Sequence, residues 1–272
     1  MFFVFDGLLW VALLLDRSRC WVYSFSNFQY SNRTMNELAH HYPPIGVIRT
    51  GFTQKFGVPR QSLMISEARG IVKLNPDPGY RTALNHLSEF SHLWLVFVFH
   101  HSIPKGWRPT IRPPRLDAPR RVGVFASRSP HRPNPIGISA VALDRIDFDA
   151  PGGIEIHVSG VDLMDDTPIL DIKPYIPYSD SIPAANSGWI HSEIPQYEVT
   201  FAESCARDAE LLPMITQVLQ WDPRPTSQRR GVPIEAEESQ GKKYGLRIRE
   251  FEVKWEIRNR AIHVLSISSS PT

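Results

Sequence analysis

The sequence predicts a mainly β fold, and three observations support this prediction. Short apolar runs with the two-residue alternation of β-strands recur along the chain, as at Val122 and Val124 and again from Ile136 to Val141. Prolines and turn residues separate these runs, with 24 prolines in 272 residues. The strands do not alternate with helices, and the chain lacks GxGxxG, phosphate-loop, GxSxG and HExxH patterns. These absences argue against a doubly wound α/β enzyme and against a zinc hydrolase.

The composition is that of a soluble globular protein. The chain is 42% hydrophobic and 21% charged, and its length allows one large or two modest domains. Its two cysteines, Cys20 and Cys205, form no disulfide or metal spacing, which indicates a reducing compartment. We therefore expect a cytoplasmic protein.

The first residues differ from the rest of the chain. The apolar run from Phe2 to Leu15 is interrupted by Asp6 and is shorter than the roughly 20 residues that span a bilayer. No basic segment precedes it, which argues against a secretory signal. We expect residues 1–40 to be an extension that is disordered or not native, with Met35 as the natural start. A membrane anchor is the alternative.

A first domain is expected over residues 41–190. The expected strands end at turn residues, and the apolar run SHLWLVFVFHH is expected to be the most buried of them. In order, the predicted elements are strand Ile45–Thr50, strand Gly70–Leu74, a helical turn Ala83–Phe90 packing Leu84, Leu87 and Phe90 inward, strand Ser91–His101 and strand Ile154–Val158.

The composition changes between Ile182 and Pro195, so a smaller α+β domain is expected over residues 191–272. Its predicted elements are strand Tyr197–Ala202, a helix Glu203–Leu219 interrupted at Pro213, and a β-hairpin of Leu246–Ile257 and Ile262–Ile267 with Arg258-Asn259-Arg260 at its turn.

The most informative stretch is Arg121–Leu143. Two apolar runs flank a hinge in which Pro130, Pro133 and Pro135 remove backbone donors and force extended geometry. The same hinge contains Arg128, His131, Arg132 and Asn134. So much stiffness around a few polar groups favours a preorganised site. The alternative is a basic surface hairpin.

A basic band precedes and includes this hinge, although the net charge of the chain is only +2. The segment Trp107–Pro119 contains four prolines and is expected to lack regular structure. Its arginines alternate with rigid residues and an aromatic side chain, which suits RNA phosphates and stacked bases. A solvated arm is the alternative. From His101 to Pro135 one acid, Asp117, stands against eight basic residues: Lys105, Arg108, Arg112, Arg115, Arg120, Arg121, Arg128 and Arg132.

The second informative stretch, Val161–Tyr178, is rich in aspartate. Its spacing lacks the central glycine and terminal glutamate of a helical-pair calcium loop. The histidine pair His100-His101 has no third ligand at a zinc-like spacing. We therefore expect no metal site.

These two stretches also carry a family resemblance. GVFASRSPHRPNPIG and LMDDTPILDIKPYIPYSDS resemble the TsaA-like family, the TrmO-type tRNA adenosine N6-methyltransferases, as do Pro59-Arg60-Gln61 and the segment Asp222–Pro225. The resemblance extends from about Ile45 to about Ile267. It implies a small β-barrel that binds S-adenosylmethionine and works as a homodimer on the anticodon loop of tRNA, with no membrane partner.

The resemblance also implies a set of cofactor residues. The family usually has DGTP where this chain has Asp165-Asp166-Thr167-Pro168, and aspartate tolerates positive φ less well than glycine does. This departure puts the turn geometry in question. The implied cofactor contacts are Pro59, Arg60, Gln61, His100, His101, Arg128, Ile138, Asp162, Leu163, Asp165 and Thr167.

Methylation at N6 of adenine makes a specific chemical demand. The exocyclic amine is a poor nucleophile, so preplaced acceptors must take its hydrogens as the nitrogen pyramidalises. We expect Asn134 and the carbonyls beside Pro133 and Pro135 to do this, with Asp171 or Tyr175 assisting. The residues expected to contact RNA are Arg108, Arg112, Arg115, Arg132, Lys173 and Arg224.

The implied reaction is conversion of the threonylcarbamoyl-modified adenosine beside the anticodon to its N6-methyl form. Two other classes of function stay open at this point. One is a non-enzymatic module that binds RNA or S-adenosylmethionine, and the other is a methyltransferase that acts on a small molecule.

Overall fold

The computed structural model describes residues 3–5, 8–10, 41–113, 121–190, 194–225, 228–229 and 233–269. The chain divides into two compact units, Met1–Tyr42 and Pro43–Thr272. In the first unit, strands β1 (Phe3–Phe5) and β2 (Leu8–Trp10) pair antiparallel. Most of the predicted N-terminal extension, including Met35, lies outside the described residues. Within the described part of the chain, no helix has both the length and the apolar character to cross a bilayer.

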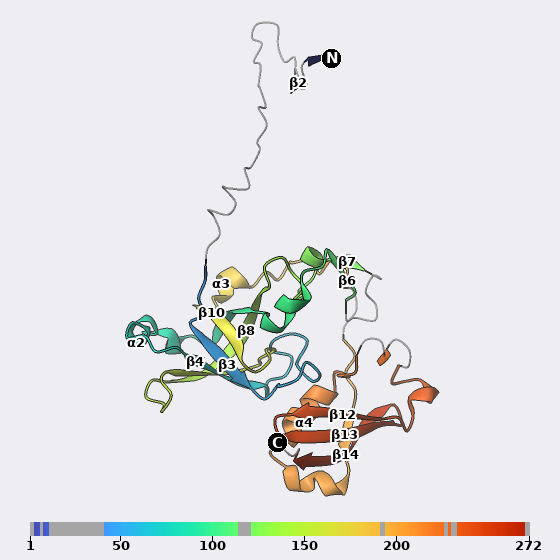
Figure 1. Cartoon of the computed structure of the whole chain (residues 1–272). Coiled ribbons are helices and arrows are strands. Elements are labelled where there is room, and N and C mark those ends of the chain that lie inside the picture. The colour runs from blue at the N-terminus through green and yellow to red at the C-terminus, as the bar shows by residue number, and fades with distance from the viewer. Residues whose placement is uncertain are drawn as a thin grey trace. The chain divides into compact units, whose positions relative to one another are not determined.

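A closed, antiparallel six-stranded barrel forms the first domain of the second unit, as the resemblance implied (Figure 1). Around the barrel the strand order is β10-β3-β4-β9-β8-β5. The strands are β3 (Gly46–Thr50), β4 (Arg69–Leu74), β5 (His92–Val98), β8 (Ile136–Asp147), β9 (Glu155–Ser159) and β10 (Thr167–Pro174).

The barrel interior is filled by alternate side chains of each strand. On β5, Leu93, Leu95 and Phe97 are buried, whereas the residues between them are only half-buried. The strand is therefore buried on one face, and none of its residues is fully exposed. In a small closed barrel only one face of a strand reaches the core, and the other face of β5 is partly open to solvent.

The connections between the barrel strands contain short helical turns. The predicted turn Ala83–Phe90 is split in two, and Phe90 is 37% exposed rather than packed inward. The helical segments are α2 (Tyr80–Ala83), η1 (Leu87–Glu89), η2 (His100–Lys105), η3 (Val124–Ala126) and α3 (Pro177–Asp180).

A two-residue ladder lies in the proline-rich arm. Strand β6 (Thr110–Ile111) pairs with β7 (Val122–Gly123), so the prediction of no regular structure in Trp107–Pro119 is wrong for two residues. The ladder ends at Gly123, and Val124 begins η3 instead of continuing a strand. The arm therefore folds back on the start of the hinge.

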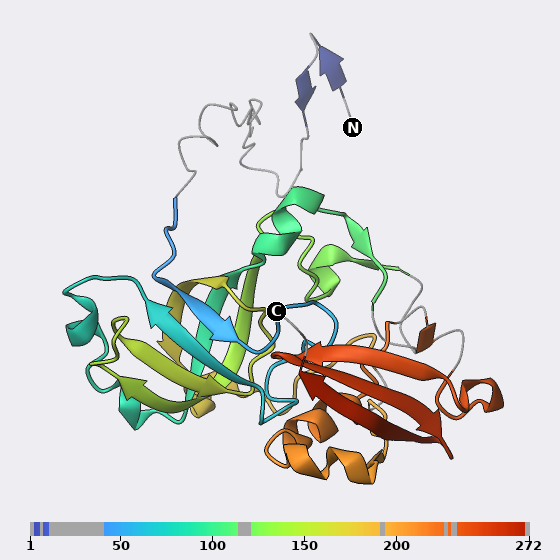
Figure 2. The same cartoon turned by 60° about the horizontal axis from the view of Figure 1, so that its bottom comes forward.

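The C-terminal domain is a four-stranded sheet with helical segments along one face (Figure 2). Its strand order is β11-β14-β13-β12, in which only β11 and β14 run parallel. The helix α4 packs Met214, Ile215, Val218 and Leu219 inward. The elements are β11 (Val199–Phe201), η4 (Glu203–Asp208), α4 (Leu212–Leu219), η5 (Glu237–Ser239), β12 (Lys243–Ile248), β13 (Phe251–Arg258) and β14 (Ala261–Ser269).

Two details correct the predicted elements here. The long strand Leu246–Ile257 breaks after Ile248, because Arg249 adopts a positive φ of 53° and reverses the chain into β13. Pro213 lies in the first turn of α4, where its missing N–H costs nothing, so it starts the helix rather than interrupting it. The predicted turn at Asn259 and Arg260 is confirmed, with φ of 52° and 62°.

Candidate active site

The hinge between β7 and β8 is braced from within. The guanidinium of Arg132 donates from Nη1 to the carbonyls of Ser127, at 2.7 Å, and Val124, at 3.1 Å. The carbonyl of Pro135 accepts from the amide of Phe99 at 2.7 Å, which fixes the hinge to the end of β5. Asn134 lies exposed at the tip. Arg132, predicted to contact RNA, therefore holds the hinge in shape.

A polar cluster forms where this hinge meets the predicted cofactor loop. Arg128 Nη1 donates to Gln61 Oε1 at 2.7 Å, and Gln61 Nε2 donates to the Arg60 carbonyl at 2.7 Å. Ser139 Oγ donates to Asp162 Oδ1 at 2.6 Å. Burial raises the pKa of Asp162, and the hydrogen bond from Ser139 and the charge of Arg128 oppose that rise. The structure thus brings together three predicted cofactor residues, Gln61, Arg128 and Asp162.

Sequence reasoning missed Ser139. Its side chain is 3% exposed and occupies an inward position of β8, between the inward-facing Gly137 and Val141. A hydroxyl in the barrel interior needs a partner, and Asp162 supplies it. A polar residue at an apolar position of the strand alternation was the available signal.

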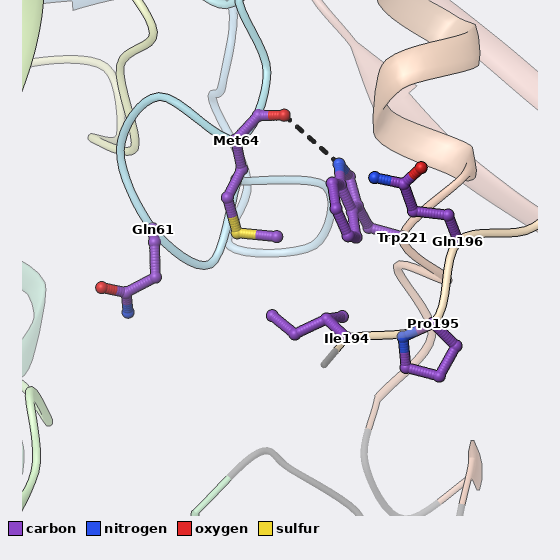
Figure 3. Close-up of a pocket in the computed structure, with 6 residues that line it drawn as sticks. All are labelled: Gln61, Met64, Ile194, Pro195, Gln196 and Trp221. Carbon is purple, nitrogen blue, oxygen red and sulfur yellow. Dashed lines mark hydrogen bonds between the residues drawn. The ribbon is translucent and has the colours of Figure 1, made fainter. Parts of the chain in front are cut away.

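The loop that carries Gln61 is tied to the C-terminal domain. Arg60 Nη2 donates to the Asp222 carbonyl at 2.5 Å. The indole N–H of Trp221 donates to the Met64 carbonyl at 3.3 Å (Figure 3). Farther along, Gln217 Oε1 accepts from the amide of Glu67 at 3.2 Å. Pro59 is buried in this loop. We call these contacts the domain tie, which also includes the bond from the Arg249 amide to the Gly51 carbonyl at 2.9 Å.

The histidine pair begins η2 directly after β5. The ring centroids of His100 and His101 are 3.9 Å apart. Burial lowers the pKa of His100, and the neighbouring His101 lowers it further, while the charge of Asp166 acts in the opposite direction. His100 is therefore mainly neutral near pH 7. Among the described residues, no group of three or more His, Cys, Asp or Glu side chains is placed to hold a metal ion.

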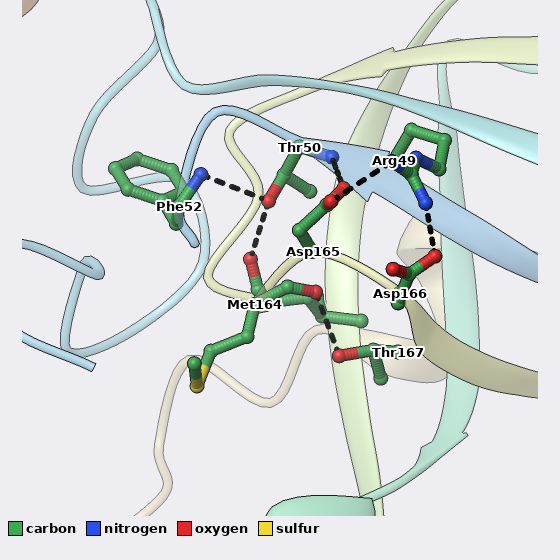
Figure 4. Close-up of polar contacts among 8 residues, drawn as sticks. Arg49, Thr50, Phe52, Met164, Asp165, Asp166 and Thr167 are labelled. Atoms are coloured by element: carbon green, nitrogen blue, oxygen red, sulfur yellow. Dashed lines mark hydrogen bonds and ion pairs between the residues drawn. The ribbon is translucent and has the colours of Figure 1, made fainter. Parts of the chain in front are cut away.

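The aspartate-rich turn is closed by its own polar groups (Figure 4). The carboxylate of Asp165 accepts from the Thr50 amide at 2.8 Å and pairs with Arg49 at 3.1 Å. Thr167 Oγ1 donates to the Met164 carbonyl at 2.7 Å. Leu163 is 2% exposed and belongs to the barrel core. Asp165, Thr167 and Leu163, all predicted cofactor contacts, therefore build the turn in this structure.

The backbone conformation of Asp166 shows how the turn forms without the glycine that the family usually has at this position. It adopts a positive φ of 59°, the region in which glycine is favoured and aspartate is tolerated. Its carboxylate pairs with Arg49. The turn keeps the backbone conformation that a glycine would take, and the added side chain gains an ionic partner.

One of the predicted catalytic residues, Asp171, lies on the outer face of the barrel wall. Asp171 pairs across the ladder with Val96, and Val96 pairs with Ile138, so the three lie in one row on the outer face. In the next row Lys173 pairs with Trp94. Because neighbouring residues of a strand point to opposite faces, Ile138 points outward and Ser139 points toward Asp162 inside.

Asp171 and Tyr175 therefore do not meet the cofactor cluster within one chain. Asp171 Oδ2 pairs with Lys173 Nζ at 2.7 Å. The ring of Tyr175 packs beside His92 and Trp94, with centroids 6.3 and 5.5 Å apart. The outer face thus carries its own group of polar and aromatic side chains.

The predicted RNA residues fall into three groups. Arg108, Arg112 and Lys173 are exposed, whereas Arg115 lies outside the described residues. Arg224 is 1% exposed, and its guanidinium donates from Nε and Nη2 to the two oxygens of Asp222, at 2.8 and 2.9 Å. An RNA phosphate cannot reach a side chain enclosed in this way. The prediction that Arg224 contacts RNA is therefore wrong.

The fold and the cluster define a class of protein: a closed β-barrel with a polar cluster at one hinge, joined to a second domain that holds one loop of that cluster. Residues 47–181 match the family described as tRNA-methyltransferase O N-terminal domain, and residues 194–270 match the TrmO C-terminal domain. The chain belongs to the tRNA-methyltransferase O family.

Similar proteins span most of the chain. It is 37% identical over 236 residues to the tRNA (adenine(37)-N6)-methyltransferase of Escherichia coli, covering 83% of this chain and 97% of that protein. It is 38% identical to the putative S-adenosylmethionine-dependent methyltransferase RcsF of Pseudomonas aeruginosa, covering 85% and 99%. A crystal structure of TrmO from P. aeruginosa superposes with a TM-score of 0.68 at 35% identity, covering 86% and 98%.

Proposed function

We propose that this chain transfers a methyl group from S-adenosylmethionine to N6 of adenosine 37 in tRNA, and that its substrate is the threonylcarbamoyl-modified form of that adenosine. The observation that carries the proposal is the cluster of Gln61, Arg128 and Asp162, together with the exposed Asn134 on the hinge that also carries Arg128. Membership of the tRNA-methyltransferase O family and the names of the relatives support the reaction.

The side chains of the cluster fit S-adenosylmethionine. When bound, this cofactor supplies a methyl group on a positively charged sulfur. Its methionine part carries a carboxylate, which suits the guanidinium of Arg128, and an ammonium, which suits a carboxylate. Because burial raises the pKa of Asp162, a nearby cation would stabilise its charged form. We assign these two residues to cofactor binding, with Gln61 holding Arg128 in position.

Asn134 is the residue that we assign to the reacting amine. The carbonyls of Asn134 and Pro135 already accept backbone bonds from Ile136, at 2.8 Å, and Phe99. The side-chain amide oxygen of Asn134, exposed at the tip of a braced hinge, is left to accept a hydrogen of N6. Such an acceptor stabilises the charge that develops on the nitrogen without having to reorganise.

The Asn134→Ala variant tests this assignment. Removing one preorganised hydrogen-bonding group from a reacting centre typically lowers kcat by about 100- to 1,000-fold. Affinity for S-adenosylmethionine, measured by calorimetry, should stay within about twofold of the parent. Full activity with normal cofactor affinity would show that Asn134 has another role.

We further infer that the chain works as a homodimer across the outer face of β8, β5 and β10. Ile136 is 43% and Ile138 is 56% exposed on this face, in the same rows as Val98 and Val96. Burying these apolar side chains against a second copy would remove them from water. It would also place Asp171 and Tyr175 of one copy toward the other copy, which explains why they lie apart from Asp162 in a single chain.

Mixing two inactive variants tests this dimer. In a mixed dimer of Asn134→Ala with Tyr175→Phe, one site would carry both defects and the other would be intact, so random mixing should restore about a quarter of the activity. A monomeric mass in light scattering, or no recovery on mixing, would contradict the inference. The Ile138→Asp variant should separate the copies.

The activity test uses purified protein, labelled S-adenosylmethionine and tRNA with or without the threonylcarbamoyl group. After digestion to nucleosides, label in the methylated threonylcarbamoyl nucleoside is the expected result. Equal labelling of both tRNAs would contradict the substrate, and cofactor binding without transfer would favour a binding module. A tRNA substrate and the absence of a cysteine motif support a cytoplasmic location.

A further inference from the structure

A cavity of about 830 Å³ lies between the cofactor loop and the C-terminal domain (Figure 3). This volume lies within the range of small-molecule sites, roughly 300–1,000 Å³. It is lined by Gln61 and Met64 from the barrel loop and by Ile194, Pro195, Gln196 and Trp221 from the C-terminal domain. Both domains are therefore needed to form it.

The residues that line the cavity are suited to an uncharged, planar ligand. None of its six residues is charged, so neither a phosphate nor a carboxylate would find an ionic partner there. Trp221 contributes an aromatic face, and the bond from its N–H to the Met64 carbonyl orients the ring. Gln196 is exposed and offers both a donor and an acceptor, as does the polar edge of a heterocycle. Amide groups paired with an aromatic face are typical of nucleobase recognition.

The position of the cavity relates it to the cofactor cluster. Gln61 lines the cavity and also accepts from Arg128, which lies in the field of Asp162. An occupant would thus lie one side chain away from the groups assigned to the cofactor. Arg60 and Arg128 place positive charge beside an otherwise uncharged lining, which suits the phosphates flanking a base.

We propose that this cavity receives an unstacked nucleobase of the RNA that neighbours the methylated adenosine. The base stacks on Trp221, and Gln196 contacts its edge. This inference rests on the proposed function insofar as it takes RNA as the substrate. Trp221 and Gln196 are then residues that determine RNA specificity, and the C-terminal domain takes part in reading the loop.

The test places the fluorescent base 2-aminopurine on either side of the target adenosine in an anticodon stem–loop RNA. Stacking on the indole should quench its fluorescence when the full-length protein binds, at one of the two positions. The quenching should be lost in Trp221→Leu and retained in Trp221→Phe, which keeps an aromatic face. Since stacking on an aromatic side chain is worth about 1–3 kcal/mol, Trp221→Leu should weaken RNA binding roughly 5- to 150-fold.

A second variant covers the case in which Trp221→Leu does not fold. Gln196→Ala changes an exposed side chain, and it should weaken binding of the intact RNA but not of an RNA that is abasic at the neighbouring position. Gln54→Ala removes an exposed amide that does not line the cavity and serves as the matched control. Equal weakening of both RNAs by Gln196→Ala would overturn the proposal.

The outcomes separate this inference from the proposed function. If the parent protein does not bind the stem–loop, the RNA substrate itself is wrong and both fail. If it binds the RNA and the fluorescence is independent of Trp221, only the cavity assignment fails. If Trp221→Leu weakens binding of S-adenosylmethionine instead, the cavity belongs to the cofactor, and the proposal is likewise overturned.

Discussion

Two aspartates, one in each domain, lie next to arginines, but their negative charges are compensated to different extents. Asp222 in the C-terminal domain receives two bonds from the buried guanidinium of Arg224, which also donates to Tyr244 Oη at 3.3 Å. Burial alone would lower the pKa of Arg224, yet its contacts with Asp222 outweigh this effect and raise it. Asp162 in the barrel receives hydrogen bonds from the Ser139 hydroxyl and from backbone amides, including that of Ser62, yet burial raises its pKa.

This difference is the one expected between a structural carboxylate and the binding carboxylate that we propose for Asp162. In the C-terminal domain the charge of Asp222 is neutralised by the adjacent Arg224, so this pair has a structural role. In the barrel the cation that acts on Asp162, Arg128, is partly engaged by Gln61. The site therefore holds an acid whose charged form is incompletely compensated, and a cationic ligand would supply the missing charge.

Breaking the compensated pair should have the largest effect. Arg224→Met leaves Asp222 buried without its cation, and we expect a loss of about 3–5 kcal/mol in the free energy of unfolding, measured by urea denaturation. Adding Asp222→Asn should recover part of this loss. Arg81→Ala, which breaks the exposed pair with Asp149, is the control and should cost less than about 1 kcal/mol. A loss below about 1 kcal/mol for Arg224→Met would mean that the buried pair contributes no more to stability than the exposed pair does.

Neutralising the uncompensated acid should have the opposite effect on stability. Asp162→Asn keeps an acceptor for Ser139 but removes a disfavoured charge, so the free energy of unfolding near pH 7 should rise by roughly 0.5–2 kcal/mol. Affinity for S-adenosylmethionine should fall about 10- to 150-fold, the value of a charged hydrogen bond. Thermal unfolding and calorimetry test both parts, and a destabilised variant with normal affinity would make Asp162 structural.

The pH dependence sharpens the same comparison. Because the folded state binds the Asp162 proton more tightly than the unfolded chain does, its contribution to stability is greatest below the ordinary pKa of 3.8 and falls as the pH rises through the raised pKa. Cofactor affinity should run the other way, weakening by up to about tenfold per pH unit as the pH drops through that pKa. Asp162→Asn removes the titrating carboxyl but keeps Arg128 and His100. The cofactor affinity of this variant should therefore lack this dependence on pH.

A third aspartate, Asp166, should matter least. Asp166→Gly relaxes a residue with φ of 59° but loses the ion pair with Arg49, whose side chain is 47% exposed. The two effects oppose each other, and we expect a change within about 0.5 kcal/mol of the parent in unfolding experiments. Activity should stay within about twofold. A large gain in activity would mean that the missing glycine impairs the site.

Local patterns in the sequence were sufficient to predict most strands of the barrel. Alternation at Ile136–Val141 and turn residues after Thr50 and Leu74 located β8, β3 and β4, because these signals act within a few residues. The barrel itself was implied by the family resemblance, and its strand order is known only from the structure. The prediction for Asp166 also held in part, since the glycine that it replaces indicated a positive φ before the structure did.

The sequence could not predict contacts that depend on how the folded chain packs. Arg224 and Arg132 have the same side chain as the exposed Arg108, and only packing shows that one is enclosed by Asp222 and the other spans the hinge. Likewise, the sequence placed Asp171 and Asp162 in one motif. The ladder register puts the first on the outer face of the barrel and the second beside the inward-facing Ser139.

The domain tie also determines where this protein tolerates change. Its bonds from Arg60, Trp221 and the Arg249 amide all end on main-chain oxygens, those of Asp222, Met64 and Gly51. Every residue supplies a carbonyl, so a substitution on the accepting side leaves the acceptor in place. The sensitivity of this junction therefore rests on the donor side chains of Arg60 and Trp221 and on Gln217, which accepts from the Glu67 amide with its side-chain oxygen. A substitution at Met64 would keep the carbonyl that accepts from Trp221, whereas a substitution at position 60 or 221 that removes the donor would remove a bond between the two domains.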